Sequence, residues 1–198
     1  MTCQILLASE SPRRRELLDL IGVRYQVFAA GVDESVLDGE DPEAHVARLA
    51  LAKARAGRER GGADLPVLGA DTIVLLDGAI LGKPRTADEA ADMLRRLANR
   101  THHVLSAVAV LACDGAVGQR LNCTLVEFGD IPTGWIDAYC RGSEPMDKAG
   151  AYAIQGEMAQ WVRRIDGSYS GVMGLPLFET ADLLRECGVS LLPGRAGR

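Results

Sequence analysis

The sequence predicts an α/β protein, and three observations support that fold class. Short apolar runs typical of buried strands, such as residues 5–8 and 66–76, come before stretches with helical periodicity. Signals for the start of a helix recur along the chain, each consisting of a capping residue followed by Pro or by an acidic first turn. The length of 198 residues allows one domain or two small lobes with a sizeable core.

The composition is that of an ordinary globular protein, with 47% hydrophobic and 25% charged residues and a formal net charge of −5. This acidic balance argues against a nonspecific nucleic-acid binder, because a phosphate backbone requires a basic surface. The five cysteines are scattered without a C-x-x-C pair, which favours reduced thiols. We find neither a signal-peptide pattern nor the roughly 20 apolar residues that span a bilayer. We therefore expect a soluble cytoplasmic protein with no membrane partner.

The stretch from Leu6 to Leu18 predicts an anion-binding site. Residues 5–8 have the pattern of a buried strand, Ser11 offers a side-chain oxygen as N-cap, and Pro12 suits the first helical position. The N-terminus of a helix attracts anions and disfavours cations. Arg13 and Arg14 nevertheless lie in that first turn. A bound anion explains them most easily, and the alternative is that they are solvated surface charges.

A second helix is expected from Pro42, with Asp41 before it, to about Arg58. Lys53 follows Val46 by seven residues and therefore falls on the apolar face of this helix. Such a lysine either extends outward from the edge of the apolar face or points into a cleft between layers. The sequence leaves both readings open.

Asp71 interrupts residues 66–76, the most apolar run of the chain, which has the pattern of a central strand. A buried carboxylate is costly without a partner or a metal, so we favour a functional role. Asp77-Gly78 then predicts a hairpin turn, and Lys83 follows it in Gly-Lys-Pro. This is not a Walker loop, because the glycine spacing is one residue short and Pro replaces Ser or Thr.

The rest of the chain continues the alternation. His102 and His103 are adjacent on a predicted strand and face opposite sides, so they cannot bind one metal. The further expectations are a helix after a capping box at Thr86, strands at 101–112 and 117–128, a helix at 135–141, a polar segment at 143–156, a hairpin of strands 160–165 and 168–173, a helix from Pro176 to Gly188 with Leu177, Ala181 and Leu184 facing inward, and a frayed tail at 191–198.

Three kinds of group could converge in one site: the arginines of the first helix, Lys53 and Lys83, and the carboxylates Asp71 and Glu34. Several cations beside a helix end suit a polyphosphate. The carboxylates would repel that ligand unless a divalent cation lies between them, and they could also activate a water. The residues therefore indicate metal-assisted phosphoryl or nucleotidyl chemistry, without naming the bond that breaks.

Four blocks of sequence resemble the Maf family of nucleoside triphosphate pyrophosphatases, over about residues 4 to 187. They are Leu-Ala-Ser-Glu-Ser-Pro-Arg-Arg at 7–14, Gly-Ala-Asp-Thr at 69–72, Gly-Lys-Pro at 82–84, and Gly-Ser-Tyr with Gly-Leu-Pro-Leu at 167–177. Residues 147–156 resemble the branch that hydrolyses dTTP and UTP, whereas the 7-methyl-GTP branch carries a different sequence there.

The resemblance implies a two-lobed mixed sheet flanked by helices with a central cleft, similar to the inosine triphosphatases, in one domain over residues 1–198. It implies cleavage of the α–β phosphoanhydride with Mg²⁺ or Mn²⁺ and a homodimer. By resemblance Asp71 is the proton acceptor, and Glu34 and Asp71 lie near the metal. Ser9, Arg13, Arg14, Lys53 and Lys83 match positions that hold phosphates, and Arg13, Thr72 and Gln155 match positions linked to base specificity. A buried Gln amide could pair with the edge of uracil or thymine.

Two departures from the family pattern concern Glu10, often small or neutral in the family, and residues 157–160 after the Gln-Gly pair. Two other functions stay open at this point. One is the 7-methyl-GTP branch, and the other is a cell-division regulator that binds nucleotide without turnover. The combination of Asp71 with the lysines favours catalysis, because a pure binder does not need a carboxylate beside a polyphosphate.

Overall fold

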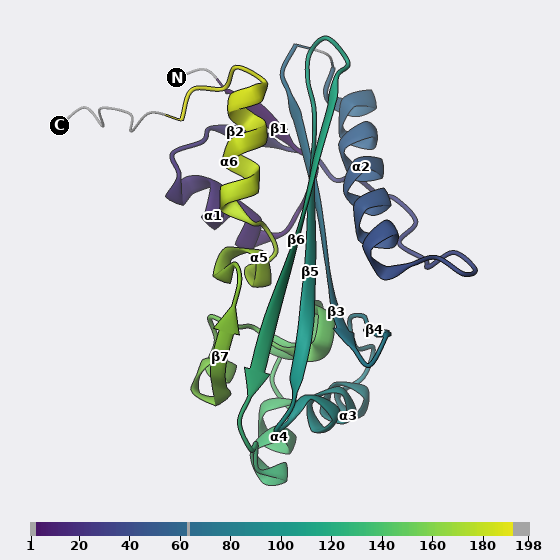
Figure 1. The fold of residues 1–198 in the computed structure, drawn as a ribbon, viewed down its shortest axis with the longest axis vertical. Coiled ribbons are helices and arrows are strands. Elements are labelled where there is room, and N and C mark those ends of the chain that lie inside the picture. Colours follow the sequence, from purple (N-terminus) through teal and green to yellow (C-terminus); the bar gives the residue numbers. More distant parts are fainter. Residues whose placement is uncertain (1–2, 63, 192–198) are drawn as a thin grey trace, which may run out of the picture. The chain divides into compact units, whose positions relative to one another are not determined.

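The computed structural model describes residues 3–62 and 64–191 (Figure 1). The tail expected to fray lies outside these residues from position 192 onward. The elements are β1 (Ile5–Leu7), α1 (Pro12–Leu20), β2 (Tyr25–Val27), α2 (Pro42–Gly61), β3 (Val67–Leu76), β4 (Ala79–Leu81), α3 (Ala87–Leu97), β5 (Thr101–Leu111), β6 (Val117–Phe128), α4 (Thr133–Tyr139), η1 (Glu144–Asp147), η2 (Ala149–Ala151), η3 (Glu157–Trp161), β7 (Val162–Asp166), α5 (Tyr169–Met173) and α6 (Leu177–Glu186).

The strands form one seven-stranded mixed sheet in the order β2-β1-β3-β5-β6-β7, with β4 paired to β3. The short strand β1 pairs in parallel with both β2 and β3, as strand–helix–strand connections require. The β3–β4 and β6–β7 pairs are antiparallel. The predicted mixed α/β fold with flanking helices is therefore confirmed.

The chain divides into two compact units. The first takes in the described residues up to Asp71, Ser106–Asn122 and those from Gly174 onward, and the second takes in Thr72–Leu105 and Cys123–Met173. One buried cluster of the first unit joins Leu6, Ala8, Ala30 and Val67. A larger cluster in the second unit gathers the apolar faces of α3 and α4, the ends of β5 and β6, and the segment before Gln155.

Two of the predicted helix starts are confirmed in atomic detail. The Asp41 carboxylate accepts a hydrogen bond from the Glu43 N–H at 2.9 Å, and α2 begins at Pro42. The Thr86 hydroxyl accepts from the Glu89 N–H at 3.1 Å at the start of α3. These caps satisfy N–H groups that no intrahelical carbonyl can reach.

Three details of the secondary-structure prediction differ from the structure. Ser11 occupies the N-cap of α1 but makes no side-chain cap bond within the described chain; its N–H instead donates to Ser9 Oγ at 3.3 Å. Residues 168–173, expected to be a strand, contain the helix α5, and the Ser168 hydroxyl accepts a hydrogen bond from the Gly171 N–H. On α6 Leu184 is buried as expected, but the other buried residues are Thr180 and Leu183, and Leu177 and Ala181 are only half-buried.

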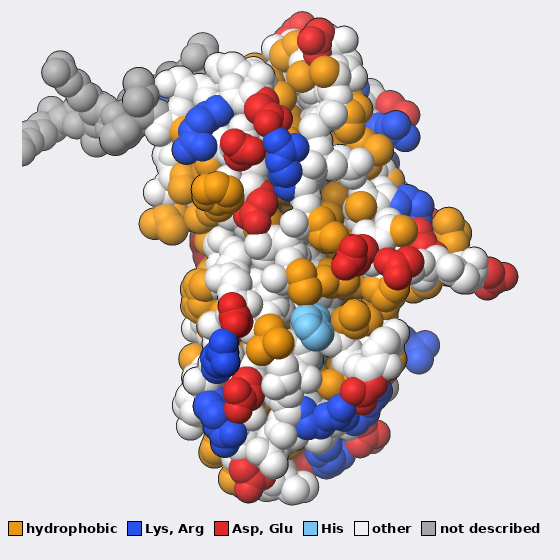
Figure 2. Space-filling model, in the orientation of Figure 1, with side chains coloured by type: hydrophobic (Ala, Val, Ile, Leu, Met, Phe, Trp, Pro, Cys, Tyr) orange, Lys and Arg blue, Asp and Glu red, His pale blue; other side chains and the backbone are white. Residues whose placement is uncertain are grey.

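Surface charge is mixed on the face that Figure 2 displays, where acidic and basic side chains lie interspersed. Among the described residues, no helix is long and apolar enough to cross a membrane. His102 is buried and His103 is exposed, which confirms that the two rings face opposite sides of β5.

Candidate active site

The turn between β1 and α1 places Ser9 and Arg14 together. Buried Ser9 follows β1, and its hydroxyl accepts a hydrogen bond from Arg14 Nη1 at 2.9 Å. Arg14 Nε also donates to the Gly174 carbonyl at 2.8 Å, so two contacts hold the half-buried guanidinium. Burial lowers the pKa of Arg14, and the nearby Asp71 carboxylate opposes that shift. This arginine is therefore not a freely solvated surface charge.

The charged neighbours of Arg14 differ from one another in burial. Arg13 is half-buried in the same first turn, whereas Arg15 and Glu10 are exposed. The exposed Glu10 follows Ser9 directly, so its carboxylate has access to solvent at the edge of the predicted anion site. This turn brings together two of the predicted phosphate-binding residues, Ser9 and Arg14.

Lys53 lies inward, which decides the question that the sequence left open. Its side chain is only 10% exposed, and its ammonium nitrogen Nζ lies 2.7 Å from Asp71 Oδ1 and 2.6 Å from Glu34 Oε1. Asp71 is 9% exposed, and Glu34 is 47% exposed. The lysine therefore stands between a buried carboxylate on β3 and a partly solvated one on the loop after β2. We call these three residues the charged centre.

A close approach of helix to strand makes the charged centre possible. A Cβ atom at Gly69 would lie 2.3 Å from the Ala50 carbonyl oxygen and 2.5 Å from the Ala54 nitrogen. Such distances are far inside van der Waals contact, so only glycine lets α2 lie against β3 here. Lys53 precedes Ala54, and Asp71 follows Gly69 by two residues on the same face of the strand.

The loop that carries Glu34 is fixed to α2 by an ion pair that the sequence did not reveal. Arg48 donates to both carboxylate oxygens of Glu40, through Nε at 2.5 Å and Nη2 at 2.8 Å. It also donates to the Ser35 carbonyl at 3.0 Å. The Glu40 side chain is 8% exposed and lies 2.9 Å from His45 Nδ1 as well. We call the Glu40–Arg48 pair with its Ser35 contact the loop clamp.

The charged centre fits a divalent cation by its chemistry. Asp71 and Glu34 converge on one positive charge, the Lys53 ammonium, and carboxylate oxygens are the ligands that Mg²⁺ prefers. The charged centre offers only two carboxylates, and the described part of the chain contains no group of three or more His, Cys, Asp or Glu side chains that could surround a metal ion. A cation bound here would therefore take its remaining ligands from phosphate oxygens and water, as Mg²⁺ commonly does.

The other predicted residues, Thr72, Lys83 and Gln155, belong to the second unit. Thr72 is half-buried on β3, and Lys83 is exposed after β4. Gln155 is exposed in a turn, so the expectation of a buried Gln amide is wrong for this structure. Within this unit the Gly150 N–H donates to the Gly82 carbonyl at 3.1 Å, which joins the segment before Gln155 to the segment that carries Lys83.

Fold and charged centre define an α/β protein with a basic helix start and a buried carboxylate–lysine pair. A family profile described as Maf-like protein matches residues 4–187, and the chain belongs to the Maf family. A dTTP/UTP pyrophosphatase from Burkholderia pseudomallei (strain 1710b) is 51% identical over 197 residues, which cover 94% of each chain. A dTTP/UTP pyrophosphatase from Alkalilimnicola ehrlichii is 51% identical over 187 residues, which cover 92% of each.

One solved structure supports the fold. A HAM1 protein from Coxiella burnetii superimposes with a TM-score of 0.53 and 17% sequence identity, covering 96% of this chain and 100% of that one. At this identity the likeness concerns the fold alone, and it agrees with the fold that the family resemblance implied.

Proposed function

We propose that the protein is a nucleoside triphosphate pyrophosphatase that hydrolyses dTTP and UTP to the nucleoside monophosphate and pyrophosphate. One structural observation carries the proposal: the Lys53 ammonium is held within 2.7 Å of Asp71 and 2.6 Å of Glu34. This arrangement provides a carboxylate to accept a proton and a cation to meet phosphate oxygens. The substrate assignment rests on relatives that bear this name and are about half identical over nearly the whole chain.

In this proposal Asp71 accepts the proton of a water that attacks the α-phosphorus. The new P–O bond forms as the bond from the α-phosphorus to the bridging oxygen breaks, and pyrophosphate leaves with that oxygen. A divalent cation, Mg²⁺ or Mn²⁺, held by Asp71 and Glu34 would neutralise phosphate charge. Ser9, Arg13, Arg14 and Lys53 bind the phosphates, since hydroxyl, guanidinium and ammonium donors suit phosphate oxygens.

Thr72, Lys83 and Gln155 complete the proposed set of substrate-binding residues, on the strength of the family resemblance. The exposed amide of Gln155 is available to a ligand, and an amide can both donate to and accept from a pyrimidine edge. We further propose a single pyrophosphatase domain over residues 1–198 that acts in the cytoplasm as a homodimer, with no nucleic-acid partner.

A substrate panel tests this proposal. Pyrophosphate release is measured with Mg²⁺ for dTTP, UTP, CTP, GTP, ATP and 7-methyl-GTP. The highest kcat/KM is expected for dTTP and UTP. A preference for 7-methyl-GTP would reassign the chain to the other branch, and nucleotide binding without turnover would favour the regulator.

The role of Asp71 is tested by Asp71→Asn, which keeps the size of the side chain and removes its charge. We expect turnover to fall about a hundredfold or more, the range found for loss of a general base. Nucleotide binding should stay measurable by calorimetry. Asp77→Asn is the matched control, because Asp77 is an exposed aspartate just after the same strand and pairs with Arg100. Full turnover in Asp71→Asn would contradict the assignment.

A further inference from the structure

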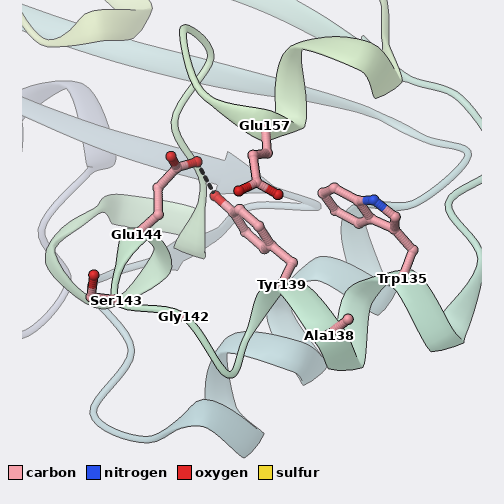
Figure 3. Close-up of a pocket in the computed structure, with 7 residues that line it drawn as sticks. All are labelled: Trp135, Ala138, Tyr139, Gly142, Ser143, Glu144 and Glu157. Carbon is pink, nitrogen blue, oxygen red and sulfur yellow. Dashed lines mark hydrogen bonds between the residues drawn. The ribbon is translucent and has the colours of Figure 1, made fainter.

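A pocket of about 380 Å³ lies within the second unit and contains none of the residues of the proposed reaction (Figure 3). Trp135 and Tyr139 of α4 form one side of it. Glu144 begins η1, and Glu157 begins η3. In Figure 3 the Glu157 carboxylate points toward the aromatic side of the pocket. The volume falls within the range of small-molecule sites.

The charge of this pocket has one sign. Among the described residues that line it, the two that carry charge are Glu144 and Glu157. No Lys, Arg or His is among these described lining residues, and the neighbouring Lys148 ammonium donates to the Glu144 backbone carbonyl and to the Asp147 carboxylate. A ligand that enters this space therefore gains from positive charge.

Glu144 is held in place before any ligand arrives. The Tyr139 hydroxyl donates a hydrogen bond to Glu144 Oε1 at 2.7 Å. Burial raises the pKa of Tyr139, so its hydroxyl keeps the proton that it donates. A Cβ atom at Gly156 would lie 2.3 Å from Glu144 Oε1 and 2.5 Å from Oε2, so this glycine leaves the room that the carboxylate occupies. Because the carboxylate is already held in place, a ligand that binds it loses little free energy to ordering this side chain.

The aromatic side of the pocket is equally fixed. The Trp135 and Tyr139 rings are stacked, with centroids 5.1 Å apart and planes at 15°. Trp161 packs edge-on against Trp135 at 5.5 Å. Rings held by each other present a stable π surface, and such surfaces attract cations.

We propose that this pocket binds a small organic ammonium ion, an aliphatic amine whose nitrogen meets the carboxylates and whose carbon chain lies on Trp135. Aromatic rings and carboxylates together recognise this chemistry. A hydrated metal ion would gain nothing from the rings. The site also lacks a third carboxylate among the described residues that surround it.

The chain supplies its own reporter for this binding. It has two tryptophans, Trp135 and Trp161, and they contact each other at this pocket. Tryptophan fluorescence, excited selectively over the four tyrosines, therefore reports on this region alone. Trp161→Phe isolates the Trp135 signal, and it removes no hydrogen bond, since the buried Trp161 Nε1 has no partner among the described residues.

Putrescine is titrated both into the unaltered protein and into Trp161→Phe at constant ionic strength, with 1,4-butanediol as the uncharged probe of equal length and MgCl₂ as the metal probe. We expect a saturable change in fluorescence with putrescine alone. An equal change with the diol, or no saturable change, would overturn the proposal. Tighter binding of Mg²⁺ than of putrescine would also overturn it.

Glu157→Gln, in the Trp161→Phe background, should weaken putrescine binding about threefold to fivefold, the effect of losing an exposed charge pair. Glu59→Gln is the matched control, because Glu59 is an exposed glutamate of α2 in the other unit. Unchanged affinity in Glu157→Gln would contradict the assignment of this carboxylate. The test needs no nucleotide turnover, so its outcome is independent of the proposed reaction.

Discussion

The two units of the chain bury different kinds of chemistry. In the first unit, Lys53 and Asp71 are charged side chains with about a tenth of their surface exposed. In the second unit, the buried polar pair is neutral: His102 Nε2 and the Tyr152 hydroxyl share a hydrogen bond of 2.8 Å, with the Phe128 ring packed against both. The difference predicts that removing one charge of the Lys53–Asp71 pair destabilises the first unit, whereas protonation of His102 destabilises the second.

The largest effect is expected for Lys53→Met. This change leaves Asp71 buried without its counter-charge, and breaking a buried ion pair costs about 3 to 5 kcal/mol. The half-exposed Glu34 adds little, because water screens it. Urea unfolding followed by circular dichroism gives the free energy.

The double variant Lys53→Met/Asp71→Asn should recover most of that loss, since no lone buried carboxylate remains. Lys83→Met is the control, because substitution of an exposed side chain changes the free energy of unfolding by no more than about 0.5 kcal/mol. If the double variant is no more stable than Lys53→Met, charge is not the cause of the loss, and the contrast between the units fails.

The second effect concerns pH and the second unit. Burial, with a smaller contribution from His103, lowers the pKa of His102 from 6.5 to about 4. The unfolded chain thus takes up this proton near pH 6.5 and the folded chain only near pH 4. The neutral His102 ring therefore contributes its full stabilisation above pH 6.5 and loses it as the pH falls to 4. At 1.36 kcal/mol per pKa unit, the free energy of unfolding falls by about 3 kcal/mol over this range.

The check is urea unfolding at several pH values between 7 and 4. His102→Phe/Tyr152→Phe removes both partners of the buried hydrogen bond and should flatten this part of the pH dependence. His103→Gln, at an exposed position of the same strand, should keep it. An unchanged slope in the double variant would assign the acid sensitivity to other groups.

The smallest effect on stability is expected for Arg48→Ala, which opens the loop clamp. The Glu40 carboxylate loses its guanidinium partner, so the free energy of unfolding should fall, but by less than for Lys53→Met. Arg48 also pairs with Glu40 strongly enough to lower the pKa of that carboxyl. Without the clamp, amide exchange should rise in residues 33–41.

Activity sharpens this prediction. Because Glu34 lies on the clamped loop, Arg48→Ala should raise the Mg²⁺ concentration for half-maximal turnover more than it lowers kcat. Arg120→Ala is the control, since it breaks exposed pairs with Asp182 and Glu186 that are worth at most about 1 kcal/mol. Equal metal dependence in both variants would mean that the clamp does not position Glu34.

Local signals predicted most of the fold. The caps at Asp41 and Thr86 and the hairpin at Asp77-Gly78 depend on residues close in sequence, and the structure has all three. The failure at residues 168–173 has a tertiary cause. Gly167 has φ +131°, and a Cβ there would lie 2.6 Å from Thr124 Oγ1, so the chain turns against β6 instead of forming a hairpin.

The charged centre was predictable in its members but not in its geometry. The helical spacing from Val46 placed Lys53 on the buried face, and the apolar run around Asp71 marked that carboxylate as unusual. The loop clamp could not be predicted from such patterns in the sequence. Glu40 and Arg48 meet across a loop and a helix start, and neither lies in an apolar pattern that would single it out.

The contact at Gly69 has a consequence for protein engineering. The spacing between α2 and β3 is set by backbone atoms, and a single methyl group at position 69 would collide with the Ala50 carbonyl. A library that aims at new substrates should therefore leave positions 50, 54 and 69 constant. Variation belongs in the loops, where Glu10 and Gln155 are exposed and a new side chain does not disturb the helix–strand contact.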